Sequence, residues 1–136
     1  MNHLIVRDFR IIIFYRCPWT DEVDKAIKLA KNLNKKILFD IDDLVIDIKY
    51  TNLISYVKDS FSLSEQNIYK EGVIRIGKTL KLCEGAITTT EFLAKELKKY
   101  VPIVYINRNT ASEEMLKLSE KALKKKKAIK KTNEIF

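Results

Sequence analysis

The sequence has few of the residues that interrupt helices and few cysteine or histidine residues. Its 136 residues include three glycines, two prolines, two cysteines and one histidine. So little glycine and proline argues against a loop-rich all-β fold and favours long helices. Cys17 and Cys83 are too few and too far apart for a metal cluster, and nothing in the cysteine usage indicates an oxidising compartment.

Long apolar runs are also missing from the chain. No run approaches the roughly 18 residues that a transmembrane helix needs. The first ten residues, MNHLIVRDFR, carry charge too early for a signal peptide. A chain of this length suits one domain, and we expect a cytoplasmic protein.

The net charge of +8 is unevenly distributed along the sequence. Residues 117–131 carry eight lysines and one glutamate, which leaves residues 1–116 nearly balanced. A balanced globular part gives no indication of a nucleic-acid partner. We expect the lysine-rich segment to form a solvated helix, and the alternative is peripheral contact with anionic lipid at the inner face of the membrane.

Hydrophobic periodicity predicts that strands and helices alternate along the chain. Strands are expected at 9–16, where the chain should be buried, and at 36–41, 85–89 and 101–107. Helices are expected after hydroxyl residues that can cap them, namely Thr20, Ser62, Thr88 and Thr110, with a short helix near 50–58.

This alternation predicts an α/β fold. We expect a three-layer Rossmann-like domain with a short, mostly parallel sheet of about four strands and helices on both faces. Residues 1–110 would form that domain, and residues 111–136 would form a lysine-rich helix leading to a second domain that the chain lacks. The helix after Ser62 contains Gly72 and Gly77, each of which costs about 1 kcal/mol relative to alanine, so we expect close packing against a neighbour there.

The segment ILFDIDDLVID, residues 37–47, places three carboxylates directly after a strand. In parallel sheets, ligands bind outside the carboxyl ends of the strands. That rule selects four segments: 16–19, 40–44, 88–91 and 107–109. The candidate substrate-binding residues within them are Arg16, Asp40, Asp42, Asp43, Thr90 and Asn109. The sequence identifies no catalytic residue, and no metal ion is expected.

Each of these residues also has a structural role open to it. Asp40 and Asp42 could accept hydrogen bonds from sugar hydroxyls or cap the following turn. Arg16 could form an ion pair with the acids across neighbouring strand ends, which would offset their repulsion, or it could contact a phosphate. Thr90 could cap a helix, and Asn109 could end a turn.

Three segments, taken in order, resemble a known family. They are FYRCPWTDEVDKAIKLAKNLNKKILFDIDDLVID, CEGAITTTEFLAKEL and VPIVYINRNTASEEMLKLSEKA, which together span about residues 9–123. In this order they resemble the N-terminal domain of bacterial glycosyltransferases with two Rossmann-like domains, a large retaining family that includes cell-surface polysaccharide transferases. The matching features are a strand that ends in arginine, a DxDD junction, a threonine-rich turn and a V-x-x-N segment.

The resemblance implies an acceptor-side domain. The acceptor would be a glycan or a lipid-linked glycan, and the donor a nucleotide-sugar held mainly by a C-terminal domain. No cofactor or bound metal is implied, and the chain would be inactive alone because that second domain is missing.

Two other classes of function remain open. The first is a non-catalytic interaction domain that self-associates as a homo-oligomer through apolar surface that a partner domain would otherwise cover. The second is a magnesium-dependent phosphatase that uses Asp40 as nucleophile and Asp42 as general acid. Asp43 and Leu44 stand where that family normally has glycine and threonine or valine.

Overall fold

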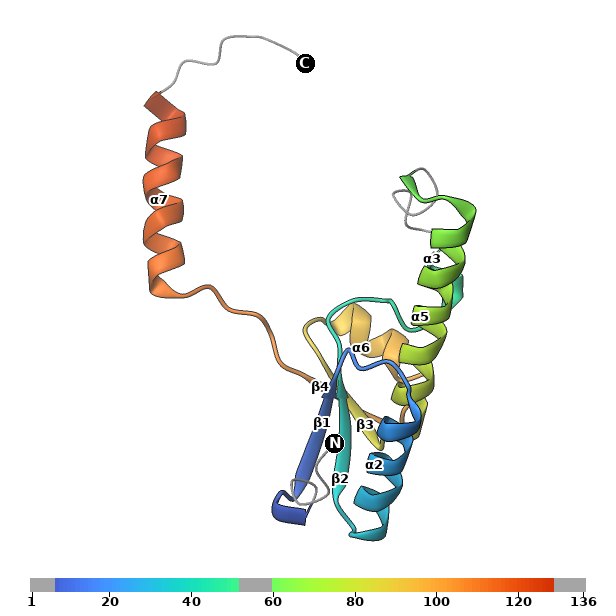
Figure 1. Cartoon of the computed structure of the whole chain (residues 1–136). Coiled ribbons are helices and arrows are strands. Elements are labelled where there is room, and N and C mark those ends of the chain that lie inside the picture. Colours follow the sequence, from blue (N-terminus) through green and yellow to red (C-terminus); the bar gives the residue numbers. More distant parts are fainter. Residues whose placement is uncertain (1–6, 52–59, 129–136) are drawn as a thin grey trace.

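The structure is a computed structural model that describes residues 7–51 and 60–128 of the chain. Figure 1 shows its elements, which are, in order, β1 (Ile11–Tyr15), α2 (Asp21–Asn32), β2 (Lys36–Asp40), α3 (Ile48–Thr51), α5 (Leu63–Leu82), β3 (Gly85–Thr88), α6 (Glu91–Leu97), β4 (Ile103–Ile106) and α7 (Glu113–Ala128). The predicted α/β class and the predicted four-stranded parallel sheet are confirmed. Most of the helix expected near 50–58 lies outside the described residues.

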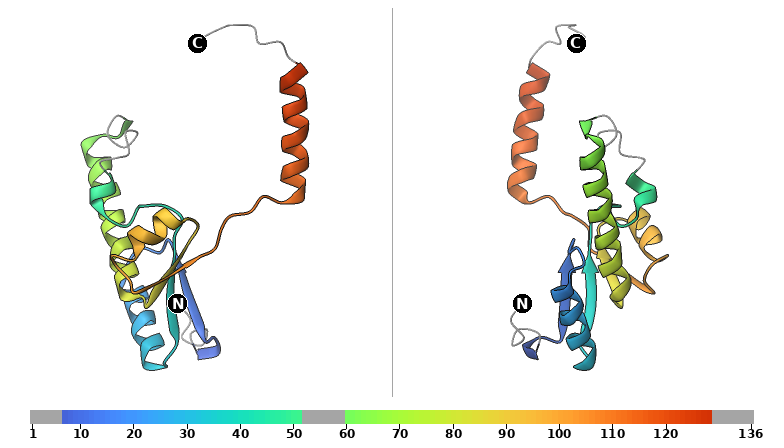
Figure 2. Two further views of the ribbon diagram at one scale, coloured as in Figure 1. Left: turned by 180° about the vertical axis from the view of Figure 1, so that it is seen from behind. Right: turned by 45° about the vertical axis from the view of Figure 1, so that its right-hand side comes forward.

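The strands follow one another across the sheet in chain order, β1-β2-β3-β4. Crossovers between parallel strands are right-handed almost without exception, so an order that never reverses places the crossover helices on one face. The core agrees, because one cluster joins Ile27 of α2, Leu80 of α5 and Leu97 of α6 to Phe14 and Phe39 of the strands. Helices α2, α5 and α6 therefore cover one face of the sheet, whereas the sequence predicts helices on both (Figure 2).

The other face of the sheet carries the side chains that alternate with the core residues. Its cross-strand rows are Ile13–Leu38–Gly85–Ile103 and Tyr15–Asp40–Ile87–Tyr105. On β1, Ile11, Ile13 and Tyr15 are 51%, 51% and 62% exposed, and only Phe14 is buried. The expectation that this strand is buried is wrong, because β1 is an edge strand and no described helix covers this face. We call this surface the open face.

One contact crosses the open face from β2 to β4. The amine of Lys36 donates a hydrogen bond to the hydroxyl of Tyr105 at 3.1 Å and lies 5.6 Å from the centre of its ring. Gly85, on the strand between them, has no side chain to obstruct this contact. Lys36 and Tyr105 thus pack against one another across the open face.

Two of the predicted helix starts are confirmed. The hydroxyl of Thr20 accepts a hydrogen bond from the backbone N–H of Val23 at 3.2 Å and caps α2. Ser62 and Glu65 make both hydrogen bonds of a capping box at the start of α5. Such caps satisfy backbone N–H groups that have no partner within the helix.

The other two helices begin two residues later than predicted. Thr90, for which the sequence left a capping role open, caps α6 in place of Thr88 and accepts from the N–H of Leu93 at 3.2 Å. At α7 the hydroxyl of Ser112, rather than that of Thr110, accepts from the N–H of Met115 at 3.2 Å. Both segments contain more than one hydroxyl residue. Where the preceding strand or loop ends decides which of them caps the helix.

The two glycines of α5 have different surroundings. A Cβ atom on Gly77 would lie 2.1 Å from the main-chain oxygen of Ile46, because the loop after β2 passes directly over the helix at this point. A Cβ atom on Gly72 would meet nothing within 4 Å. Close packing is confirmed at Gly77, and the same expectation is wrong for Gly72.

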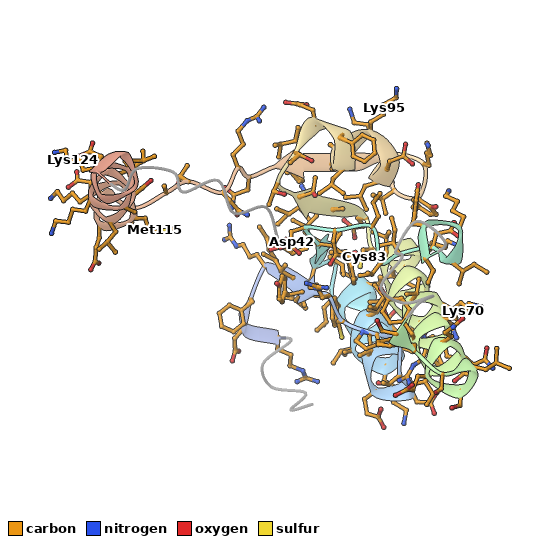
Figure 3. All side chains as sticks on the ribbon, turned by 90° about the horizontal axis from the view of Figure 1, so that it is seen from above. Asp42, Lys70, Cys83, Lys95, Met115 and Lys124 are labelled. Carbon is orange, nitrogen blue, oxygen red and sulfur yellow. The ribbon has the colours of Figure 1, made fainter. Side chains whose placement is uncertain are left out.

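The last helix, α7, does not join the core. All of its described side chains, from Glu113 to Lys124, are exposed. Figure 3 shows α7 end-on and separated from the rest of the fold, on the side of the open face. Within the described residues, no helix is both long enough and apolar enough to cross a membrane.

Candidate functional site at the carboxyl edge of the sheet

The carboxyl ends of the four strands meet at one edge of the sheet, where backbone hydrogen bonds extend the ladder. The N–H of Arg16 donates to the oxygen of Asp40 at 3.0 Å, and the N–H of Ile41 donates to that of Ile87 at 3.1 Å. The N–H of Asn107 donates to the oxygen of Thr88 at 2.7 Å. These bonds fix the first residues after each strand, from which the candidate site is built.

Arg16 forms ion pairs with two of the three acids. Its guanidinium lies 2.6 Å from the carboxylate of Asp43 and 3.6 Å from that of Asp42. The backbone of Arg16 has a φ of 43°, in the left-handed region, where the chain turns sharply after β1. These side chains are about 40% exposed, so the pairs contribute less than about 1 kcal/mol to stability.

Asp43 has the turn-capping role that the sequence left open for Asp40 and Asp42. Its carboxylate accepts a hydrogen bond from the backbone N–H of Val45 at 3.2 Å, two residues further on. Together with the ion pair to Arg16, this bond satisfies Asp43 within the protein. Asp43 therefore belongs to the frame of the loop rather than to a free binding surface.

Asp40 differs from its two neighbours. It is half-buried at the end of β2, between Tyr15 and Ile87 in the cross-strand row of the open face. Its carboxylate makes no ion pair and no hydrogen bond with any other described residue. Burial raises the pKa of the Asp40 carboxyl, and the charge of Asp42 raises it further.

A small pocket of about 160 Å³ opens beside Asp40. Side chains from all four strand ends surround it, and the lining residues are Tyr15, Asp40, Asp42, Ile87, Thr88, Thr89, Asn107 and Asn109. Figure 3 looks onto this edge of the sheet and labels Asp42 there. We call it the carboxyl-edge pocket.

The lining of the carboxyl-edge pocket combines acceptors and donors of hydrogen bonds. The carboxylates of Asp40 and Asp42 accept, the amides of Asn107 and Asn109 donate and accept, and the threonine hydroxyls do both. The hydroxyl of Thr88 is buried and has no hydrogen-bond partner among the described residues. Thr88 is only 1% exposed, so this buried hydroxyl lies behind the pocket and is not presented to a ligand there.

A larger and more apolar pocket of about 510 Å³ lies on the other side of the Arg16–Asp43 ion pair. It is lined by Arg16, Asp43, Leu44, Val45, Tyr50, Tyr69 and Leu93. The six predicted site residues are thus divided. Asp40, Asp42 and Asn109 line the carboxyl-edge pocket, Arg16 and Asp43 line the apolar one, and Thr90 lines neither and serves as the cap of α6.

Four polar or aromatic residues of the carboxyl-edge pocket were not among the predicted site residues. They are Tyr15, Thr88, Thr89 and Asn107. The rule that ligands bind at strand carboxyl ends had selected the segments that contain the last three. Tyr15 was missed because its position opposite Asp40 depends on the register of β1 and β2, which the sequence does not give.

We searched the part of the chain that the structure describes for side chains that could bind a metal ion together. There, no group of three or more histidine, cysteine, aspartate or glutamate residues is arranged to hold a metal ion.

Comparisons with protein-family models, with curated proteins and with solved structures found no match to this chain.

Proposed function

We propose that the carboxyl-edge pocket binds the hydroxyl groups of a sugar, and that the chain supplies the acceptor-binding surface of a glycosyltransferase. The observation that carries the proposal is the carboxylate of Asp40, which has no ion-pair or hydrogen-bond partner among the described residues and lines the same small pocket as Asp42 and two asparagines. Carboxylate and amide groups suit the alternating donors and acceptors of a sugar ring. The position at the strand carboxyl ends is where α/β sheets bind ligands.

The proposal assigns a role to each side of the pocket. Asp40 and Asp42 accept hydrogen bonds from sugar hydroxyls, and the amides of Asn107 and Asn109 donate to the sugar oxygens. The ring of Tyr15, 62% exposed beside Asp40, offers an apolar surface to the face of the sugar. The ion pair between Arg16 and Asp43 positions the loop that carries Asp42.

The wider function follows the resemblance of the sequence to two-domain glycosyltransferases. The acceptor would be a glycan or a lipid-linked glycan, and a second domain would hold the nucleotide-sugar donor. The chain alone would then bind an acceptor without transferring sugar to it. The proposed function therefore differs from that of an enzyme in which one domain binds both substrates and carries out the whole reaction.

Titration followed by amide NMR spectra tests the proposal. Monosaccharides, short glycans and nucleotide-sugars would be added in turn to the labelled chain. We expect a saccharide acceptor to shift the amide resonances of Asp40, Asp42, Asn107 and Asn109. Asp40→Asn should abolish the shifts. The matched control, Glu84→Gln, changes a carboxylate at the opposite edge of the sheet and should leave them intact.

Two results would count against the proposal. If no saccharide shifts these four resonances, the carboxyl-edge pocket does not bind a sugar. Hydrolysis of a generic phosphoester that requires Mg²⁺ and is lost in Asp40→Asn would replace the proposed function with a phosphatase.

A further inference from the structure

A parallel sheet with one face left uncovered by the described residues is unusual. Parallel sheets occur almost only where both faces are covered, because their strands carry apolar residues on each side. Here the open face presents Ile103 and Tyr105 of β4, 44% and 42% exposed, beside Ile87 of β3. Exposed apolar surface of this extent normally marks a site where another element packs.

A second unpartnered apolar surface lies on α7. Met115, Leu118 and Ala122 recur at spacings of three and four, and Leu116 and Leu123 flank them. The four large side chains of this stripe are between 55% and 60% exposed. Lys117, Lys121 and Lys124 occupy the other side of the helix, and Figure 3 shows Met115 and Lys124 on opposite sides of it. Helix α7 is thus amphipathic, and its apolar stripe is not covered by any part of the chain that the structure describes.

The connection between β4 and α7 favours the chain's own sheet as that surface. Residues 107–112 form a six-residue loop, which spans at most about 20 Å when extended. Loops between a strand and the helix that packs on its sheet commonly have two to six residues. So short a tether gives α7 a high effective concentration at the edge strand from which it starts, and a second copy of the chain would have to compete with that.

The covered face offers α7 no comparable position. There α6 already contacts β3 and β4 and contributes Leu97 to the core. A helix about 10 Å in diameter covers about two strands at a spacing of about 4.8 Å. We infer that the apolar stripe of α7 packs on the β3–β4 half of its own open face and covers Ile103 and Tyr105.

Hydrogen exchange of the full chain, followed by mass spectrometry, tests this inference. A lysine-rich helix alone in water exchanges its amides rapidly, whereas a docked helix is protected. We expect the amides of α7 to be protected in a monomer. Two variants, one on each surface, should each lower that protection about tenfold, namely Leu118→Gln on the helix and Ile103→Gln on the sheet.

Each variant has a control that introduces the same residue elsewhere. Lys121→Gln lies on the polar side of α7, and Ile74→Gln replaces an isoleucine of α5 that is 55% exposed. Both controls should leave the exchange of α7 within about twofold of the parent. The amides of β2, measured in the same experiment, report whether each variant still folds.

Four results would overturn the inference. In the first, the amides of α7 are unprotected in the parent chain. In the second, their protection rises with protein concentration as light scattering detects a dimer, so that a second copy covers the face. In the third, protection requires phosphatidylserine vesicles, so that the stripe binds lipid. In the fourth, Leu118→Gln lowers protection and a folded Ile103→Gln does not, so that α7 packs elsewhere.

Discussion

The main-chain oxygen of Ile46 occupies the position that a side chain on Gly77 would need. The distance from that oxygen to a Cβ atom built on Gly77 is 2.1 Å, far inside any normal contact. The loop that carries Asp42 and Asp43 therefore continues directly against α5, with no atom between the two backbones. This contact anchors the loop of the candidate site on the core.

The two glycines of α5 should respond to alanine in opposite directions. Gly77→Ala would force the loop away from the helix, and such overpacking typically costs 1–3 kcal/mol, more than the gain in helix propensity. Gly72→Ala meets no atom and should stabilise the protein by up to about 1 kcal/mol. Urea denaturation of both variants measures the difference. A Gly77→Ala variant as stable as the parent would show that the loop moves freely.

Asp40 should make the folded protein slightly less stable at neutral pH. Its folded-state pKa is raised above the ordinary value of 3.8, so the native state binds this proton more tightly than the unfolded chain. Stability from this group is therefore present at low pH and is lost as the pH rises from about 3.8 through the raised pKa. Asp40→Asn should stabilise the protein above that range by less than about 1 kcal/mol.

Thermal unfolding from pH 3 to pH 7 checks the sign of this effect. The stability difference between Asp40→Asn and the parent should grow with pH and then stay constant. Glu84→Gln, the same change at the opposite edge of the sheet, serves as the control. If Asp40→Asn instead became less stable than the parent as the pH rises, the Asp40 carboxylate would have a favourable partner in the folded protein.

A hydrogen-bonded cluster joins the loop after β2 to the segment that follows α6. The hydroxyl of Tyr100 donates to the carboxylate of Asp47 at 2.7 Å and accepts from the amine of Lys49 at 2.7 Å. Tyr100→Phe removes both bonds and should cost about 1 kcal/mol. Tyr105→Phe removes one bond on the open face and should cost less than about 0.5 kcal/mol. Equal midpoints of urea denaturation for the two variants would contradict this ranking.

The two cysteines should differ in reactivity. Cys83 is buried, donates a hydrogen bond to the oxygen of Thr79 at 3.3 Å, and has its pKa raised by burial to about 12. Cys17 is only partly buried. In the folded protein at pH 8, a thiol reagent should modify Cys17 on the order of a hundredfold faster than Cys83. Peptide mass spectrometry measures both rates, and denaturant should abolish the difference.

Some of the candidate site could be predicted from the sequence. The strand-ending positions of Asp40 and Asn107 follow from apolar runs that stop there, and parallel strands bring such ends to one edge. The sequence could not separate the three acids, because each is one or two residues from the next. The structure pairs Arg16 with Asp42 and Asp43, and Asp40 has no partner within residues 7–51 and 60–128. That choice depends on the left-handed turn at Arg16 and on the register of β1 and β2.

The sequence by itself determined the order of helices and strands, the capping of α2 and α5, and the edge at which the polar residues gather. These features depend on neighbours a few residues apart, which the printed chain shows directly. Only the tertiary structure decided that α2, α5 and α6 share one face, that Gly77 and not Gly72 is crowded, and that Ile11, Ile13 and Tyr15 are exposed. Those outcomes depend on contacts between distant segments, because hydrophobic periodicity records that a side chain is apolar and not which element will cover it.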